Sequence, residues 1–182
     1  MADSSRILNL VKLKQGFPGV TSALGEACFE ACMICFESQH HSSGVELRLA
    51  GSFVGSFQIL WNEETTDQMG RAWYDEREAT EFAASGVAFL LIMELTQYTV
   101  LQRSRQGTGY DYWLAEKAEV DRYPFRYAAR LEVSGIRRAE KESMIKTRVQ
   151  QKLDQIKPAD ISLQTYIIVV EFSRPLAYVV EK

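Results

Sequence analysis

The chain has 182 residues, of which 46% are hydrophobic and 25% are charged, and its formal net charge is -3. This length and apolar content are enough to bury one sizeable core, so we expect a single domain over residues 1–182. The weak negative charge argues against a strong free-standing nucleic-acid binder. No apolar run is long enough to span a membrane, and the first residues lack a signal-peptide core, so we expect a cytoplasmic protein.

The first third of the chain predicts a helix followed by a hairpin. Residues 1–20 contain glycine and proline breakers, so we expect them to be a short lead-in. Apolar residues then recur with helical period from Thr21, a helix-capping residue, to about Gln39. Alternating polar and apolar residues on both sides of two glycines predict a β-hairpin over 45–61. Residues 21–61 are thus an N-terminal helix and hairpin.

Three cysteines, Cys28, Cys32 and Cys35, lie on one face of that first helix because they are spaced by four and three residues. His40 and His41 follow closely, so a zinc site is one interpretation. A structural zinc site usually needs a second, distant ligand pair, which the sequence lacks. Buried free cysteines on an apolar face are therefore favoured, and a disulfide framework is not expected.

The middle of the chain predicts a helix and three strands. We expect an acidic loop over 62–74, and then Asp75 as the cap of a helix that ends near Gln97. Runs rich in aromatic and β-branched residues predict the strands that follow. These strands cover 98–101, 110–116 and 125–134.

The last third predicts one more helix and two more strands. We expect Gly135 to end the preceding strand, and an amphipathic helix to cover 137–156 before Pro158 stops it. The continuous apolar run 166–170 is typical of a buried central strand. Residues 176–180 are expected to form a final edge strand.

Two carboxylates stand out in this pattern, because Asp111 and Glu132 lie in neighbouring predicted strands. Hard divalent cations prefer such oxygen ligands. Side chains on a strand alternate between its faces, so Arg130, Glu132 and Ser134 share one face while the apolar residues between them share the other. The first face is suited to a site, and the second to the core.

The order helix, strand, strand, strand, helix, strand over 76–172, with Asp111 and then Glu132-x-Ser134, resembles the PD-(D/E)XK, or restriction endonuclease-like, superfamily, so residues 76–182 are expected to form a nuclease-like core. The resemblance implies an α/β (α+β) fold with an αβββαβ core, in which helices flank a mixed sheet. The N-terminal helix and hairpin would be an addition to that core.

The resemblance also implies a metal site. In this superfamily the carboxylates corresponding to Asp111 and Glu132 hold Mg²⁺ or Mn²⁺, which promotes phosphodiester hydrolysis by stabilising charge on the scissile phosphate. Glu81 resembles the helix carboxylate that some members add to the metal site.

The resemblance is incomplete at one catalytic position, since Ser134 stands where the pattern has a lysine. Serine can donate a hydrogen bond but carries no charge. Lys117, at the end of the second strand, and Lys141, at the start of the following helix, are candidates for a lysine that has moved.

Other interpretations of these residues stay open. Arg130 shares a face with Glu132, so an arginine between two carboxylates would make a buried ion-pair network that needs no metal. The aromatic residues Tyr110, Tyr112 and Trp113 could stack on nucleic-acid bases, but aromatic residues in a strand more often belong to the core.

The charge is unevenly distributed along the chain. Segment 126–157 has a net charge of +5 and segment 62–81 a net charge of -5. A basic helix beside a carboxylate site would suit a phosphate-bearing substrate, with Arg137, Arg138 and Lys141 as candidate nucleic-acid contacts. A solvated helix face is the alternative.

We therefore expect a nuclease-like, DNA-binding protein of DNA metabolism or defence, with weak Mg²⁺-dependent phosphodiester hydrolysis. The alternative is a catalytically inactive binding or assembly subunit on the same fold, because Ser134 replaces the lysine. The expected partners are DNA, or a protein partner or second copy of the chain in the alternative case. A membrane partner is not expected.

Overall fold

A mixed sheet of eight strands runs through the computed structural model, which describes residues 6–156 and 163–182. The strand order across the sheet is β1-β3-β2-β8-β7-β6-β5-β4. The strands are β1 (Arg6–Asn9), β2 (Val45–Gly51), β3 (Gly55–Leu60), β4 (Tyr98–Arg103), β5 (Tyr112–Glu116), β6 (Ala129–Ile136), β7 (Gln164–Glu171) and β8 (Leu176–Glu181).

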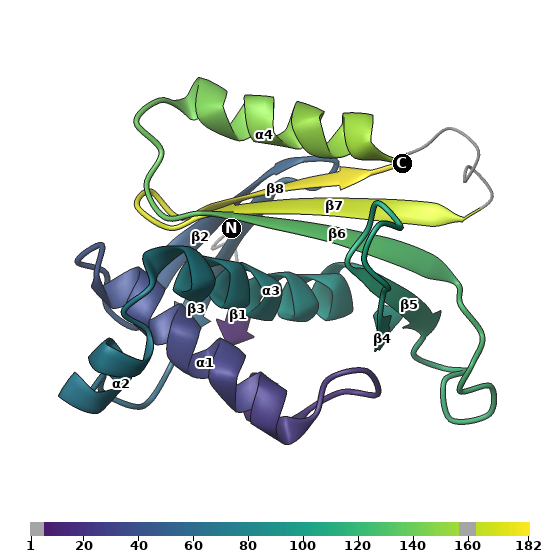
Figure 1. Ribbon diagram of the computed structural model, residues 1–182, viewed down its shortest axis with the longest axis horizontal. Coiled ribbons are helices and arrows are strands. Elements are labelled where there is room, and N and C mark those ends of the chain that lie inside the picture. Colours follow the sequence, from purple (N-terminus) through teal and green to yellow (C-terminus); the bar gives the residue numbers. More distant parts are fainter. Residues whose placement is uncertain (1–5, 157–162) are drawn as a thin grey trace, which may run out of the picture.

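Helices cover both faces of the sheet (Figure 1). They are the 3-10 helix η1 (Leu10–Gln15) and the α-helices α1 (Ser22–Glu37), α2 (Asp67–Ala72), α3 (Glu76–Leu95) and α4 (Glu142–Gln155). α1 and α3 lie together below the sheet in Figure 1, and α4 lies alone above it. The predicted α/β class, with helices flanking a mixed sheet, is confirmed.

The apolar core is divided between the two faces. The larger cluster joins α1, α3 and η1 to the sheet and includes Phe29, Phe36, Phe57, Phe89 and Leu131. A smaller cluster lies under α4, where apolar residues of the helix meet those of β6, β7 and β8. The amphipathic pattern of α4 thus buries one stripe, as its sequence predicts.

The second half of the chain follows the predicted order of elements. After α3, the strands β4, β5 and β6 form an antiparallel meander. α4 then crosses the sheet, and β7 pairs with β6 in parallel. A strand–helix–strand crossover is the usual way to join two parallel neighbours. This crossover places α4 directly over the face of β6 that carries Glu132.

The predicted N-terminal helix and hairpin are also present. Thr21 caps α1 by accepting a hydrogen bond from the backbone N–H of Leu24 at 3.2 Å, and β2 pairs with β3 in antiparallel fashion. The predicted lead-in is wrong for residues 6–15, which form β1 and η1. β1 joins the sheet beside β3 because Leu8 enters the core. The predicted acidic loop is wrong in part as well, since it contains α2.

Several details of the second half differ from prediction. β5 begins at Tyr112 and not at residue 110, so Asp111 precedes the strand, and β6 covers Ala129–Ile136 and not 125–134. Gly135 lies inside β6 and does not end it, because the strand passes so close to α3 that a side chain would not fit there. β8 is an interior strand, since β2 docks beside it, so the expectation of an edge strand over 176–180 is wrong. α4 begins at Glu142 and not at residue 137.

The expected stop at Pro158 lies outside the described residues. Among the helices that the structure describes, none is long and apolar enough to cross a membrane.

Candidate functional site

Asp111 lies at the point where β5 and β6 separate. It directly precedes β5, and its backbone N–H donates to the carbonyl of Leu131 at 2.9 Å. Its carboxylate Oδ2 accepts a hydrogen bond from the backbone N–H of Val133 at 2.8 Å. The Asp111 carboxylate therefore pairs with a backbone N–H of β6 at a point beyond the end of β5. This fixes one carboxylate oxygen at the sheet edge.

Glu132 lies beside Asp111 on β6 and is only 4% exposed. Its Oε1 accepts a hydrogen bond from Nζ of Lys152 on α4 at 2.6 Å. The pKa of Glu132 is raised to about 7, mainly by burial and next by the nearby Asp111 carboxylate, while the Lys152 ammonium opposes both effects. The two predicted carboxylates thus interact directly, and α4 supplies the balancing positive charge.

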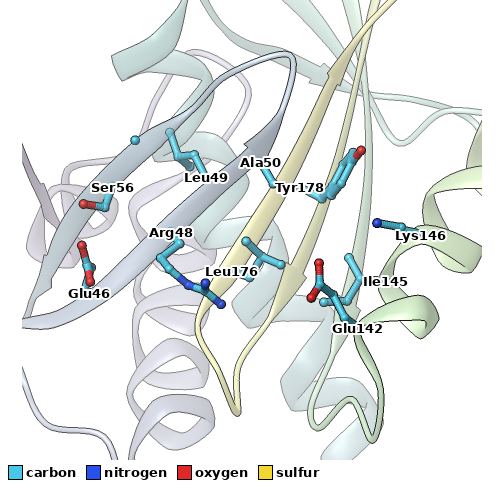
Figure 2. Close-up of a pocket in the computed structure, with 11 residues that line it drawn as sticks. Glu46, Arg48, Leu49, Ala50, Ser56, Glu142, Ile145, Lys146, Leu176 and Tyr178 are labelled. Atoms are coloured by element: carbon cyan, nitrogen blue, oxygen red, sulfur yellow. The ribbon is translucent and has the colours of Figure 1, made fainter.

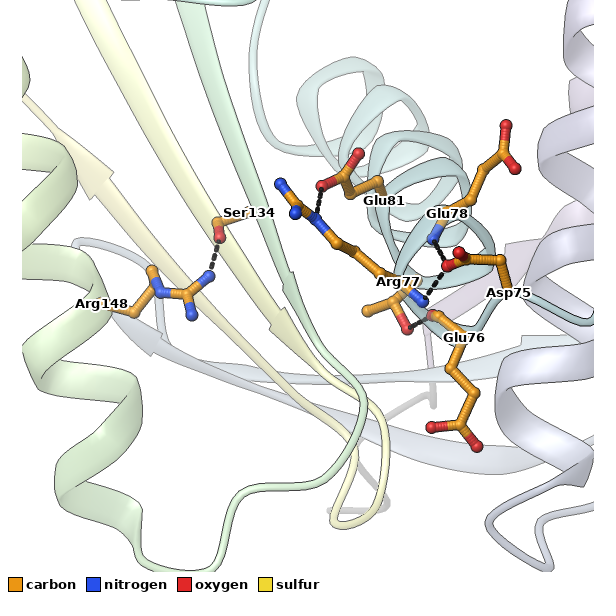
Figure 3. A network of polar contacts seen from close by, with 8 residues as sticks. Asp75, Glu76, Arg77, Glu78, Glu81, Ser134 and Arg148 are labelled. Carbon is orange, nitrogen blue, oxygen red and sulfur yellow. Dashed lines mark hydrogen bonds and ion pairs between the residues drawn. The ribbon is translucent and has the colours of Figure 1, made fainter.

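Ser134 also faces α4, where it meets an arginine. Its Oγ accepts a hydrogen bond from Nη1 of Arg148 at 2.9 Å, as Figure 3 shows. The face of β6 that holds Glu132 and Ser134 is therefore opposed by Lys152 and Arg148, which are one helical turn apart on α4.

A cleft of about 800 Å³ opens between α3, the edge of β6 and α4. Cations dominate its polar lining among the described residues: Arg77, Arg103, Arg137, Arg138, Arg148 and Lys152. The acidic residues that line it are Glu76, Glu81 and Asp111. The cleft is therefore positive, although the chain as a whole is negative. An anionic ligand would be attracted to it.

A second hollow of about 430 Å³ lies on the other side of the carboxylates. Asp111 and Arg103 line both hollows, whereas Glu132, Tyr110 and Arg105 line this one. Asp111 therefore borders both hollows, whereas Glu132 borders only the second.

Arg137 and Arg138 are held at the cleft by the segment between β6 and α4. The fully buried Glu171 accepts a hydrogen bond from the backbone N–H of Ala139 at 3.0 Å, which fixes that segment. Nη1 of Arg137 donates to Sγ of Cys35 at 2.7 Å, and Nε of Arg138 donates to Gln39 Oε1 at 3.0 Å. Two of the three predicted nucleic-acid contacts, Arg137 and Arg138, line the cleft.

Glu81 lines the same cleft from α3, but it pairs with Arg77 at 3.1 Å (Figure 3). Among the described residues, no group of three or more His, Cys, Asp or Glu side chains is close enough to hold a metal ion. The structure thus brings Asp111 and Glu132 together, but it does not add Glu81 to them as a third ligand.

The structure does not bring the two candidate lysines to the carboxylates. Lys117 donates to the carbonyl of Met93 at 2.8 Å, at the far end of α3. Lys141 is the residue before α4 and is not part of the cleft lining. Lys152, which the sequence analysis did not single out, is the lysine that contacts Glu132.

A signal for Lys152 was present in the sequence. Val149 and Leu153 form part of the inward stripe of α4, and Arg148 and Lys152 each precede one of them. Residues four apart lie on the same helix face, so these two cations flank the buried stripe. Only the register between α4 and β6 reveals that they meet Ser134 and Glu132.

The alternative ion-pair network takes a different form from the one expected. Glu132 pairs with Lys152, while the Arg130 guanidinium lies over the ring of Tyr110, 5.4 Å from its centre. Arg130 also reaches the carbonyl of Leu163 at 3.4 Å. In the part of the chain that the structure describes, Lys152 from α4 therefore pairs with Glu132.

The three cysteines are buried, as predicted. Burial raises the pKa of the Cys28 thiol to about 12 and that of Cys35 to about 11, which keeps both protonated and poorly nucleophilic at neutral pH. Cys32 is fully buried and donates to the carbonyl of Ala83 at 3.3 Å.

A third hollow, of about 330 Å³, lies between the sheet and the start of α4 (Figure 2). Arg48 and Glu46 come from β2, while Glu142 and Lys146 come from α4. Its charges are balanced, and it lies apart from Asp111 and Glu132. It therefore lacks the positive character of the cleft.

The chain matches no protein-family model, and no curated protein or solved structure was found to be similar to it. The assignment of function therefore depends on the fold and the geometry of the cleft.

Proposed function

We propose that this chain is a restriction endonuclease-like protein that carries out metal-dependent phosphodiester hydrolysis of nucleic acid, in DNA metabolism or defence. The observation that carries the proposal is the proximity of Asp111 and Glu132, which line one hollow together, while Asp111 also lines the positive cleft. The order of elements from α3 to β7 supports it, since a helix, an antiparallel meander, a helix and a parallel strand make up an αβββαβ core.

The donor set fits a magnesium-type ion. Mg²⁺ commonly binds through one or two carboxylates, and water and substrate phosphate complete its coordination. Asp111 and Glu132 would hold the ion, and no third protein carboxylate is required. When bound, such an ion supplies Lewis-acid stabilisation of the charge that develops on a phosphoryl oxygen.

Lys152 takes the place of the lysine that the motif lacks. Its ammonium lies 2.6 Å from Glu132 and is held by α4, so it can place a positive charge and a hydrogen-bond donor beside the reacting phosphate. A preorganised cation at the point where negative charge develops is an effective source of catalysis. Ser134 occupies the position of the missing lysine on β6, and it carries no charge. Arg148, which donates a hydrogen bond to Ser134, supplies a second cation at that position.

The remaining cations of the cleft would bind the phosphates on either side of the scissile one. Arg103 comes from β4, Arg137 and Arg138 come from the segment between β6 and α4, and all three line the cleft. Arginine recognises phosphate oxygens through its fork of N–H donors. These residues supply affinity without requiring any particular base sequence.

The decisive experiment compares metal binding and cleavage in matched variants. Mg²⁺ or Mn²⁺ should raise the melting temperature of the wild type by mass action, and both Asp111→Asn and Glu132→Gln should abolish the increase. The same two variants should lose cleavage of a labelled oligonucleotide. Glu94→Gln, which removes an exposed carboxylate paired with Lys12, is the control and should change neither property.

Lys152 is tested separately. Lys152→Met should reduce cleavage by about 10²-fold or more, because the cation stabilises the transition state, while Lys152→Arg should retain more activity. Cleavage by the wild type that survives both Asp111→Asn and Glu132→Gln would overturn the site assignment.

A catalytically inactive binding subunit is the second candidate, and a specific observation favours it. Asp111 Oδ2 and Glu132 Oε1 are both occupied by protein donors, and Ser134 replaces the lysine. If neither metal binding nor cleavage is found in the folded wild type, this candidate is preferred. In that case Ser134→Lys tests whether the motif lysine alone restores activity.

A further inference from the structure

A row of three aromatic rings lies beside the candidate site on the α4 side of the sheet. Tyr110 and Trp113 meet edge to face with 4.8 Å between ring centres, and Trp113 stacks on Tyr127 at 4.3 Å with 17° between the ring planes. We call Tyr110, Trp113 and Tyr127 the aromatic row. Trp113 is opposite Arg130 in the β5–β6 register, so the row shares the sheet face of Glu132.

The aromatic row differs from the aromatic residues of the core. Tyr112, the neighbour of Trp113, is buried against Phe89 on the other face. Tyr110 and Trp113 are only partly buried, and Tyr127 is 37% exposed. Strand alternation separates the buried Tyr112 from the partly exposed Trp113, whereas Tyr110 precedes β5 and packs against Trp113.

Two further rings, Tyr123 and Phe125, closely precede Tyr127 in the chain. Phe125 is 83% exposed. Arg122 lies over the ring of Tyr123, 5.2 Å from its centre. Exposed rings interleaved with arginines are the composition of surfaces that bind single-stranded nucleic acid.

The aromatic row leads directly to the carboxylates. Tyr110 lines the 430 Å³ hollow together with Asp111, Glu132 and Arg105. Tyr110 is also the residue immediately before Asp111 in the chain. A strand that stacks its bases on the row would therefore bring its backbone past Arg105 to the two carboxylates.

We propose that the aromatic row and Phe125 bind the bases of a single-stranded nucleic acid and guide that strand to the candidate site. The inference rests on the proposed function for the role of the carboxylates, but not for the binding itself. Stacking tolerates any base, because every base has a flat π-face, so the proposal gives the site a preference for single strands without a sequence preference.

The test measures binding in EDTA, where metal-dependent cleavage cannot occur. The probes are a fluorescent 12-nucleotide dT strand, an abasic strand of the same length, and a blunt duplex. We expect the dT strand to bind at least about 10-fold more tightly than the abasic strand, because only stacking distinguishes them at equal charge. The tryptophan fluorescence, to which Trp61, Trp73 and Trp113 all contribute, should be quenched by the dT strand alone.

Matched variants locate the binding surface. Phe125→Ala and Tyr127→Leu should each weaken binding of the dT strand by about 5- to 100-fold and leave the abasic strand unaffected. Phe125 is so exposed that its loss should not affect folding, which a melting temperature checks. Tyr74→Ala, which removes a tyrosine that is 86% exposed away from the row, is the control and should bind like the wild type.

The outcomes separate this inference from the proposed function. Equal binding of dT and abasic strands, preference for the duplex, or unchanged binding in both aromatic variants would overturn the inference. Asp111→Asn should bind the dT strand normally in EDTA. If the wild type binds the dT strand through the row but never cleaves it, the proposed hydrolysis fails while the strand-binding surface stands.

Discussion

At the scale of single residues, the most consequential feature is that Glu132 is buried beside a second carboxylate. Taking a carboxylate out of water favours its neutral form, and the negative charge of Asp111 acts in the same direction. Lys152 offsets only part of this effect. A divalent cation would relieve the same repulsion, which is why such pairs of carboxylates are typical of metal sites.

This environment predicts a specific pH dependence of stability. The pKa of Glu132 rises from its ordinary 4.5 to about 7 in the folded protein. Between these values the folded state holds more protons than the unfolded state, so the free energy of unfolding should fall as pH rises, by up to about 1.4 kcal/mol per pH unit. Denaturant unfolding in EDTA between pH 5 and 7.5 measures it.

The matched variant for that measurement is Glu132→Gln, which keeps the shape and removes the titration. It should be close to the wild type at pH 5 and more stable than the wild type at pH 7.5. Glu63→Gln, at a half-exposed carboxylate paired with Lys14, should follow the wild type at both pH values. If the free energy of unfolding changed with pH in the same way in the wild type and in Glu132→Gln, the titration of Glu132 would not be the cause.

At the scale of elements, the site depends on how closely β6 lies against α3. An ideal Cβ on Gly135 would come within 2.6 Å of the backbone carbonyl oxygen of Thr80 and 3.1 Å of Ala84 Cβ. Glycine therefore allows the strand to pass the helix, and the same close approach forms one wall of the cleft. Gly135 is expected from the sequence to end the strand, because a glycine that ends a strand and a glycine that allows close packing look the same in the sequence.

Gly135→Ala should destabilise the fold by roughly 1–3 kcal/mol, since backbone atoms must move to admit the methyl group. Gly70→Ala in α2 is the control, because the structure has no atom within 4 Å of the added Cβ. That control should be neutral or stabilising by up to about 1 kcal/mol, as alanine favours a helix. Denaturant midpoints compare the two. An unchanged Gly135→Ala protein would show that β6 is free to move away from α3.

At the scale of the whole molecule, a negative chain carries a positive cleft. The acidic segment 62–81 contributes α2 and the start of α3, whereas the cations that line the cleft come from α3, β4, α4 and the segment before α4. Net charge therefore says little about the local field at the site. The net charge of -3 describes the average surface and not the cleft.

The cleft should dominate the salt dependence of nucleic-acid binding. Replacing Arg137 and Arg138 with glutamine should weaken binding of a duplex or a single strand alike and reduce the slope of log Kd against log salt by about 1–2. Arg71→Gln in α2, outside the cleft, should leave the slope unchanged. An unchanged slope in the double variant would place the phosphate contacts elsewhere.

The sequence by itself determined the order of elements in the second half, the sheet face of Glu132 and the inward cysteines. These depend on hydrophobic period and strand alternation, which are local properties of the chain. The N-terminal strand β1 was not predicted, because a strand of four residues is too short to show an alternating pattern.

Only the tertiary structure decided which cation meets Glu132. The sequence does not show which of Lys117, Lys141 and Lys152 contacts Glu132. That contact depends on the register with which α4 crosses β6. That register is set by packing in the small cluster under α4, between residues far apart in the chain. Long-range packing of this kind leaves no pattern in the local sequence. The two carboxylates of the site could therefore be predicted from the sequence, but the lysine that contacts Glu132 could not.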